Sequence, residues 1–187
     1  MKDLIASLRL VVFSLLVCCV VYPAVLLAFG RVAAPRSAEG SLIVDSAGRV
    51  IGSESLAQGF TRPEYFWPRP SAVDYNATAT GGSNLSPASP EIADRARGLI
   101  ERYAPATGER VPADLVTASG SGMDPHITLA AARFQIPRVA AARGRPAAEI
   151  EALIRENTDV PSLEVFGGEP LVHVLRLNLA LDRAARN

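Results

Sequence analysis

Cysteine and lysine are nearly absent from this chain, and each absence excludes a class of chemistry. Of its 187 residues two are cysteines, Cys18 and Cys19, and both lie inside one long apolar run. The remaining sequence has no thiol, which excludes disulfides, zinc–thiolate sites and a cysteine nucleophile from it. A domain without disulfides is stabilised by its hydrophobic core, and about 150 residues suffice for that.

Lys2 is the only lysine, and every other basic residue apart from histidine is an arginine. A Walker-type phosphate loop needs a lysine at a fixed place, and a protein kinase needs one on a strand. A Schiff-base mechanism needs a lysine as its nucleophile. The chain is therefore not expected to hydrolyse ATP or to act on carbonyl substrates by any of these routes.

Metal ligands and one-sided charge are also scarce. The two histidines, His126 and His173, lie far apart in the sequence, with no cysteine near either of them. This spacing matches no common metal-binding pattern, so we expect no metal site. Acidic and basic residues number 19 each, which gives a net charge of zero. Proteins that bind nucleic acid present a basic face, so we do not expect nucleic acid as a partner.

One long uncharged segment stands out from the rest of the sequence. It runs from Leu10 to Phe29, between Arg9 and Arg31, and is almost wholly apolar. Twenty helical residues rise about 1.5 Å each, or roughly 30 Å, which matches the hydrocarbon core of a bilayer. We therefore expect the lipid bilayer to hold this segment.

The expected organisation of the N-terminal part follows from that run. We predict a short tail at residues 1–9, a transmembrane helix at residues 10–30 and a linker at residues 31–40. Pro23 removes one backbone hydrogen bond and is expected to kink the helix. Neighbouring helices in a membrane can satisfy the carbonyl group that a proline leaves free.

Two other interpretations of the apolar run compete with a permanent anchor. A cleaved signal peptide also has a basic start, here Lys2 and Arg9, and a small-residue cleavage site, here Ala28-Phe29-Gly30. The run is longer than a typical signal core, however. A buried helix of a soluble domain is apolar on one stripe, whereas this run is apolar all round. We therefore favour the uncleaved anchor.

Basic residues do not decide the orientation of this anchor. Lys2 and Arg9 precede the run, while Arg31, Arg36 and Arg49 follow it. Short N-terminal signal anchors commonly leave the N-terminus inside the cell. We therefore expect the following domain on the outer, periplasmic side of a bacterial inner membrane.

Residues 41–187 have the size of a single domain, and their patterns mix strands with helices. The predicted fold class is α+β (mixed α/β), a soluble domain anchored by one N-terminal transmembrane helix. Segments 41–44 and 49–51, which contain Leu-Ile-Val and Val-Ile, flank a turn at 45–48, and this pattern predicts a hairpin. Residues 60–90 combine prolines and glycines with an aromatic cluster, which indicates a long ordered loop rather than a linker.

Further elements follow from apolar spacing and from breakers. We expect a helix at 90–103, a strand at 114–118, helices at 128–143 and 146–157, a strand at 171–178 after a turn at Gly167-Gly168, and a helix at 179–185. Gly144 is expected to end the second helix. Pro137 lies inside the same helix and is expected to kink or split it.

The stretch from Ser119 to His126 brings serines, an aspartate and a histidine together with glycines. One interpretation is the nucleophilic site of an anchored, exported hydrolase with Ser119 or Ser121 and His126, although Gly-x-Ser-x-Gly is absent. A second is a glycine-rich turn that presents backbone N–H groups to an anion or ligand. A third is structural, with Asp124 capping a helix that begins at Pro125. The motif alone leaves the three open.

Two arginines, Arg62 and Arg69, lie among the aromatic residues of the 60–90 loop. Arginine beside aromatic residues is typical of a contact hot spot, so we expect both to contact a partner protein. The alternative is an arginine stacked on Trp67 within the same domain.

A series of short blocks follows in one order along nearly the whole chain. They are Val21-Tyr22-Pro23, Tyr65-Phe66, Arg69 to Ala72, Tyr75-Asn76, Gly81 to Leu85, Val111-Pro112, Leu115 to Ser119, Gly122, Asp124, His126-Ile127, Gln135, Arg138 to Ala140 and Leu177 to Asp182. In this order they resemble the KdpC family, the C subunit of the Kdp-type potassium-transporting P-type ATPase. Met123 and His173 depart from the family pattern, where leucine and asparagine are usual.

The resemblance implies a single-span accessory subunit that is not itself an enzyme. In that family separate subunits form the channel-like potassium path and the ATP-hydrolysing pump, and these two are the implied partners. The C subunit is thought to assist assembly and to act as a catalytic chaperone that raises the ATP affinity of the pump subunit. The present chain also lacks the Asp-Lys-Thr-Gly phosphorylation motif. No cofactor is expected to bind firmly, and ATP is expected only in a transient complex with the pump subunit.

The resemblance also suggests where contacts lie, with no catalytic residue among them. Candidate polar contacts with a nucleotide or a partner are Ser119, Ser121, Asp124 and Gln135. Candidate partner-interface residues are Tyr65, Phe66, Arg69, Tyr75 and Asn84. A domain outside the membrane does not meet cytoplasmic ATP, so an effect on ATP affinity then requires indirect coupling through the complex.

Overall fold

The computed structural model describes residues 2–103, 108–160 and 168–185. The chain divides into an N-terminal unit, residues 1–53, and a C-terminal unit, residues 54–187. Each unit is described by itself.

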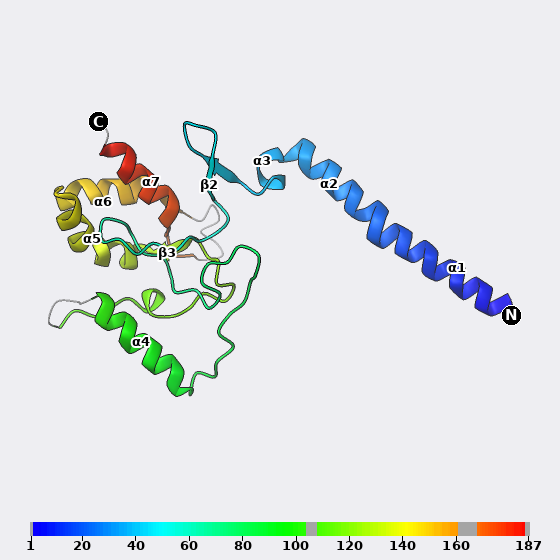
Figure 1. The fold of residues 1–187 in the computed structure, drawn as a ribbon, viewed down its shortest axis with the longest axis horizontal. Helices are drawn as coiled ribbons and strands as arrows, with labels where there is room; N and C mark the ends of the chain where they lie inside the picture. The colour runs from blue at the N-terminus through cyan, green and yellow to red at the C-terminus, as the bar shows by residue number, and fades with distance from the viewer. Residues whose placement is uncertain (1, 104–107, 161–167, 186–187) are drawn as a thin grey trace. The chain divides into compact units, whose positions relative to one another are not determined.

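A single helical run dominates the N-terminal unit (Figure 1). It consists of α1 (Lys2–Leu16), a π-helical turn η1 (Val17–Val21) and α2 (Tyr22–Ala33). The run of 32 residues is long and apolar enough to cross a membrane, and none of its residues is buried. The prediction of one N-terminal helix as candidate membrane anchor is therefore confirmed.

The ends of this helix differ from the expected boundaries. It begins at Lys2, so residues 2–9 extend the helix instead of forming a separate tail. It continues to Ala33, and a one-turn helix α3 (Pro35–Ala38) occupies much of the predicted linker. Charged residues such as Arg9 and Arg31 end the apolar run, but arginine is a good helix former. The positions of the charges therefore indicate the ends of the apolar segment, whereas the helix itself continues past them.

The predicted hairpin is present in the N-terminal unit. Strand β1 (Leu42–Val44) pairs antiparallel with β2 (Val50–Ser53), with an irregularity between Ile43 and Val44. The Asp45 carboxylate accepts hydrogen bonds from the backbone N–H groups of Ala47 and Arg49, at 2.8 and 2.9 Å. An aspartate that satisfies the turn backbone in this way is a common device for closing a hairpin.

The C-terminal unit combines helices with a small antiparallel sheet. Its elements are α4 (Pro90–Tyr103), a 3₁₀ turn η2 (Ala113–Leu115), β3 (His126–Thr128), α5 (Leu129–Arg143), α6 (Ala147–Glu156), β4 (Thr158–Asp159), β5 (Leu171–His173) and α7 (Val174–Ala184). The sheet has the order β3-β5-β4. Helices α5, α6 and α7 gather on one side, while α4 lies apart from them (Figure 1). The predicted mixed α+β fold class is confirmed.

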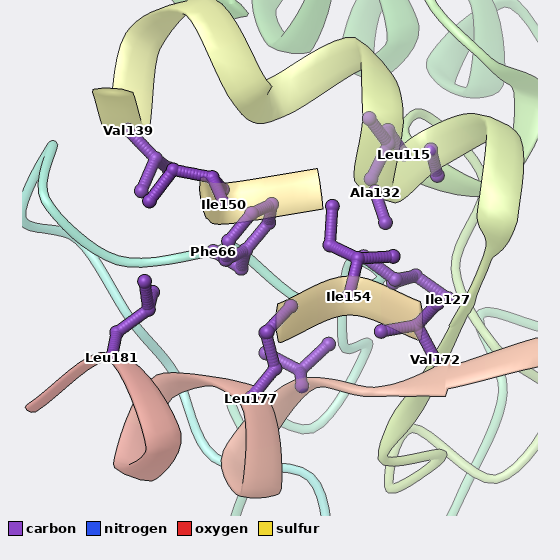
Figure 2. Packing of buried hydrophobic residues seen from close by; sticks show 12 residues of the cluster. Phe66, Leu115, Ile127, Ala132, Val139, Ile150, Ile154, Val172, Leu177 and Leu181 are labelled. Carbon is purple, nitrogen blue, oxygen red and sulfur yellow. The ribbon is translucent and has the colours of Figure 1, made fainter. Parts of the chain in front are cut away.

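The core of this unit forms where α5, α6 and α7 face the sheet and one loop residue (Figure 2). The loop residue is Phe66, which is completely buried among Val139, Ile150 and Leu177. Fully burying such a side chain is worth about 1.5–3 kcal/mol. The long loop that contains Phe66, residues 54–89, has no helix or strand, as its composition predicts.

Helix α5 has the ends that its sequence predicts. The Thr128 hydroxyl accepts a hydrogen bond from the Ala131 N–H, and Gly144 ends the helix in the left-handed conformation at φ 62°. The helix continues through Pro137 without being split. Pro137 and Arg133, whose carbonyl loses its donor, both lie on the exposed face. Water satisfies that carbonyl at little cost, which explains why the helix persists.

Two sequence-based predictions in this unit are wrong, and one interpretation that the sequence left open does not hold. Residues 114–118 are not a strand: η2 turns there and buries Leu115. The predicted strand at 171–178 ends at His173, and α7 begins at Val174. Residues 171–178 alternate, but Val174, Leu177 and Leu181 also have helical spacing, and that face is the buried one. Asp124 caps no helix, because His126–Thr128 is a strand.

Candidate functional site

Two buried amide side chains hold the backbone of the long loop. The Phe66 N–H donates to Asn178 Oδ1 at 2.8 Å, and Asn178 Nδ2 donates to the Phe66 carbonyl at 3.0 Å. The next residue, Trp67, makes the same pair of bonds with Gln135, at 2.8 and 3.1 Å. Asn178 lies on α7 and Gln135 on α5, so α7 binds the backbone of Phe66 and α5 binds the backbone of Trp67. Each amide thus satisfies the N–H and the carbonyl of one loop residue, as a neighbouring strand would do in a sheet.

Arg138 completes the attachment of this loop to α5. Its guanidinium donates to the carbonyls of Pro63 and Tyr65, at 2.6 and 2.9 Å, and to Gln135 Oε1 at 2.6 Å. It also lies 3.8 Å from the centre of the Trp67 ring. Burial lowers the pKa of Arg138 to about 10, so the group stays protonated at neutral pH. An arginine does stack on Trp67, but the expected candidates Arg62 and Arg69 are not the residues that do so.

The side chain of Tyr65 joins the loop to the end of α7. Its hydroxyl donates to Asp182 Oδ2 at 3.0 Å and accepts from Arg62 at 2.9 Å. Asp182 also pairs with the nearly buried Arg143 at 2.8 Å, and Arg143 donates to the Glu64 carbonyl. An open groove of about 420 Å³ lies alongside, lined by Gly59, Phe60, Thr61, Arg62, Tyr65, Leu175, Asn178, Leu179 and Asp182.

The serine–glycine turn packs directly on another part of the long loop. The Ser119 N–H donates to the Pro70 carbonyl at 3.2 Å, and the Gly81 N–H donates to the Ser121 carbonyl at 2.9 Å. Gly122 has φ +70°, and a Cβ there would lie 2.7 Å from Val73 Cγ2. Only glycine fits such a crowded left-handed position. The family-like blocks around residues 69–85 and 115–124 therefore form one interlocked surface, which we call the double loop.

Tyr75 and Ser71 hold the double loop in shape from within. The Tyr75 hydroxyl donates to the Arg69 carbonyl at 2.8 Å, and its N–H donates to Ser71 Oγ at 3.0 Å. The Tyr75 ring lies against Gly59, where a Cβ would be only 2.9 Å from the ring. These bonds fix the backbone from which Arg69 projects.

Asp124 is the charged centre at the edge of the double loop. It pairs with Arg69 at 3.2 Å and with His126 Nδ1 at 3.3 Å, and it accepts the His126 N–H at 3.0 Å. The hydrogen bond from the His126 side chain, followed by that from its backbone and by the Arg69 charge, lowers the pKa of Asp124. The other ring nitrogen of His126 lies 3.5 Å from Asp159.

His126 and His173 face each other across the β3–β5 pair. Their ring centres are 5.1 Å apart, and the rings meet edge to face. His173 is buried; its Nε2 bonds the Glu54 carbonyl at 2.7 Å, and its Nδ1 accepts the Arg176 N–H. Both contacts require the neutral tautomer with its proton on Nε2. Burial, which outweighs the Glu54 hydrogen bond, lowers the pKa of His173.

The predicted contact residues fall into two groups. Phe66, Ser119 and Gln135 are buried in this structure, so their side chains lie inside the C-terminal unit rather than on its surface. Tyr65, Arg69, Tyr75 and Asp124 are half-buried, and Ser121 and Asn84 are exposed. The three buried residues pack in the interior or hydrogen-bond the loop backbone. The half-buried and exposed residues reach the surface of the C-terminal unit.

The geometry does not favour the hydrolase interpretation. In the described part of the chain, the polar partners of the His126 ring are Asp124 and Asp159. The Ser121 hydroxyl instead accepts the N–H of Met123, at 3.1 Å. A nucleophilic serine needs a base within hydrogen-bond reach, and His126 is engaged elsewhere.

Sequence reasoning did not assign a role to Asn178, Arg138 or Arg143. Each lies on a helix face that otherwise packs inward, where a polar residue must find hydrogen-bond partners. That signal, a lone amide or arginine among core positions, was present in the sequence. Its partners, the backbone groups of residues 63–67, became visible only in the fold.

Comparison with known proteins finds one matching family and relatives that are similar over nearly the whole chain. Residues 4–183 match the family described as KdpC: K⁺-transporting ATPase, c chain. The potassium-transporting ATPase KdpC subunit of Parvibaculum lavamentivorans is 52% identical over 183 residues, covering 98% of this chain and 97% of its own length. The KdpC subunits of Geobacter sulfurreducens and of Synechocystis sp. are 45% and 42% identical, each over 97% of this chain and 98% of their own length. The similarity thus covers the apolar helix and the C-terminal unit together.

Proposed function

This chain belongs to the KdpC family of K⁺-transporting ATPase subunits, and on that premise we propose that it is the non-catalytic accessory subunit of an ATP-driven potassium uptake pump. Its role in this proposal is to assist assembly and to raise the ATP affinity of the ATP-hydrolysing subunit. The observation that carries the proposal is similarity over nearly the full length of the relatives, anchor included. Its partners are the ATP-hydrolysing subunit, the channel-like potassium subunit and the bilayer.

The double loop, together with Tyr65 of the preceding loop segment, supplies the proposed contact surface for those partners. Tyr65, Arg69, Tyr75 and Asn84 all project from loop segments, and the first three have hydroxyl or guanidinium groups that are already oriented. A surface whose backbone is fixed in advance loses little entropy on binding. Half-buried tyrosine and arginine are also the residues most enriched at binding hot spots.

The effect on ATP affinity is proposed to be indirect. Two of the four residues considered for nucleotide contact, Ser119 and Gln135, are buried. A third, Asp124, is a carboxylate whose pKa is lowered, so it is ionised at neutral pH and repels a phosphate. These observations support coupling through subunit contacts, in which the accessory subunit binds more tightly to the ATP-bound form of the pump.

The proposal places the C-terminal unit on the outer side of the inner membrane. This location separates it from cytoplasmic ATP and so agrees with indirect coupling. The exposed Ala152 on α6 offers a labelling position. An Ala152→Cys variant, in a background with Cys18→Ser and Cys19→Ser, is expected to react with an impermeant maleimide added to intact spheroplasts. Labelling only after lysis would contradict the outer location.

Purification of the tagged chain from detergent extracts tests the assembly role. Two large multi-span subunits are expected to co-purify, and omission of this chain is expected to abolish potassium-stimulated ATPase activity of the remaining complex. Intact activity without the chain would contradict an accessory role. Hydrolase activity of the isolated chain that is lost in Ser121→Ala would instead support the alternative function.

A further inference from the structure

The carbonyl oxygen of Cys18 has lost its usual hydrogen-bond donor inside the apolar helix. In an α-helix the carbonyl of residue 18 accepts the N–H of residue 22. In the π-helical turn the Tyr22 N–H donates instead to the Val17 carbonyl, one residue earlier. The next residue along, Pro23, has no N–H to offer. Neither the α-type nor the π-type backbone donor is therefore available to Cys18.

The same proline weakens the neighbouring position. The α-helical donor for the Cys19 carbonyl is residue 23, and proline leaves that donor missing as well. The Cys19 carbonyl thus lacks its α-helical donor, and it lies next in sequence to the Cys18 carbonyl, which lacks both kinds. π-Helical turns of this kind are rare and frequently mark functional sites.

A carbonyl without a hydrogen-bond donor is energetically costly at this depth in a membrane. Cys18 lies near the middle of the 32-residue helix Lys2–Ala33, the part that the hydrocarbon core surrounds in a spanning helix. No water is available there to replace a donor. Both cysteines are exposed, so the described part of this chain does not cover the position. A donor for the Cys18 carbonyl has to come from another molecule.

We propose that the Cys18 carbonyl, beside that of Cys19, is a docking point for a transmembrane helix of a partner subunit, which presents a hydroxyl or carboxamide hydrogen-bond donor at mid-membrane depth. This inference rests on the proposed function, in that the partner is a subunit of the potassium-transporting complex. Serine, threonine, asparagine and glutamine side chains are the groups that join membrane helices in this way. The small side chains of Ser14, Cys18 and Cys19 allow the partner helix to approach the backbone closely.

The composition of the chain makes this docking point directly observable. Cys18 and Cys19 are its only cysteines, so supply of cysteine labelled with ¹³C at the carbonyl marks these two backbone groups and no others. Isotope-edited infrared spectroscopy then reports their hydrogen bonding. The labelled chain is measured dilute in lipid vesicles and again after assembly with unlabelled partner subunits. The amide I band of the label is expected to move to lower frequency on assembly.

A Pro23→Ala variant is the matched control for the free carbonyls. It restores an N–H at residue 23 and allows ordinary helical bonds to both cysteines. Its labelled band is expected at low frequency already in lipid and is expected not to move on assembly. Because one interhelical hydrogen bond is lost, its association with the partner subunits is expected to weaken by roughly 3- to 30-fold. Pro35→Ala, in the one-turn helix α3, is expected to leave both the band and the association unchanged.

The possible results separate this inference from the proposed function. A band that does not move in a fully assembled complex overturns the docking point and leaves the accessory role intact. A low-frequency band in the dilute wild-type chain means that water or a second copy supplies the donor, and this also overturns it. A chain that does not assemble with the partner subunits at all overturns both proposals.

Discussion

Gln135 and Asn178 act at the scale of single residues, since each satisfies both backbone groups of one loop residue. Their bonds to Trp67 and Phe66 lie in a region from which water is excluded. A buried backbone group that loses its partner costs about 1–3 kcal/mol, more than the net gain from forming one bond. The main contribution of the two amides to stability is therefore that no backbone group of Phe66 or Trp67 is buried without a hydrogen-bond partner.

An Asn178→Leu variant tests this directly. It leaves the N–H and carbonyl of Phe66 without partners, so the free energy of unfolding is expected to fall by about 2–5 kcal/mol. Urea unfolding of the detergent-solubilised chain, followed by Trp67 fluorescence, measures the change. The exposed Asn76 bonds only within its own turn, and Asn76→Leu is expected to cost less than about 1 kcal/mol. Equal losses in the two variants would contradict the role of Asn178.

His173 predicts a pH dependence of stability. Its pKa in the folded chain lies below its ordinary value of 6.5, chiefly because of burial, with Arg176, His126 and Asp159 as charged or titratable neighbours. Below pH 6.5 the unfolded chain therefore binds a proton that the folded chain does not, and stability is lost as the pH falls.

The His173→Asn variant isolates this effect. The free energy of unfolding, measured between pH 7.5 and 5, is expected to fall less steeply in the variant than in the wild type. The asparagine side chain offers both donor and acceptor groups without titrating in this range. An identical slope in both proteins would show that other groups cause the pH dependence.

For single residues, the sequence indicated which side chains make specific polar contacts. It did not indicate the partners of those contacts. Asp124 and Arg69 were singled out separately, and the fold joins them at 3.2 Å. Gln135 was singled out as a polar contact residue, and the fold shows its amide bonded to the backbone of Trp67. A buried amide and an exposed one look alike in sequence, because burial depends on segments that are distant along the chain.

At the scale of elements, the double loop depends on close contact between two irregular segments. Gly122 and Gly120 belong to the same turn but differ in their surroundings. A Cβ on Gly122 would lie 2.7 Å from Val73 Cγ2 and 2.9 Å from the Gly81 carbonyl, whereas nothing lies within 4 Å of one on Gly120. The interlocking therefore depends on the first glycine and not on the second.

Gly122→Ala and Gly120→Ala form a matched pair. The first is expected to lower the free energy of unfolding by about 2–4 kcal/mol, because it combines a left-handed backbone with overpacking. The second is expected to cost less than about 1 kcal/mol. The first is also expected to weaken co-purification with the partner subunits. Indistinguishable stabilities would mean that the two loop segments separate easily.

The membrane helix makes its own prediction. Leu16→Asp, near the centre of the span, is expected to raise the free energy of insertion by about 2.5–3.5 kcal/mol. Fractionation of cells and the yield of assembled complex measure the loss of anchoring. Leu16→Ala keeps the position apolar and is expected to anchor normally. Unchanged membrane retention of the Asp variant would contradict a spanning role for this helix.

Elements with strong local signals were predicted well. Helix α5 has a threonine cap, a regular apolar spacing and a glycine terminator, and both its ends match within one residue. The predictions failed at short segments such as 114–118 and 171–178, where two or three residues fit either period. There the tertiary packing of Leu115 and Leu177 decided the structure.

At the scale of the whole molecule, the chain combines a helix long and apolar enough to span a membrane with a C-terminal unit that carries the double loop. The fold class and the anchor follow from composition and from one apolar run. The family follows from the order of short blocks, which similarity to the Parvibaculum protein over 98% of the chain bears out. The contact surface does not follow from sequence, because it arises from loops that only the folded core brings together.

The proposed accessory role requires that this subunit change the affinity of its partner for ATP without binding ATP itself. Equilibrium binding of a non-hydrolysable ATP analogue, measured on the pump complex with and without this chain, tests it most directly. Typical couplings between sites are about 5- to 150-fold. The account predicts that the dissociation constant rises within about this range when the chain is removed. An unchanged dissociation constant would contradict it.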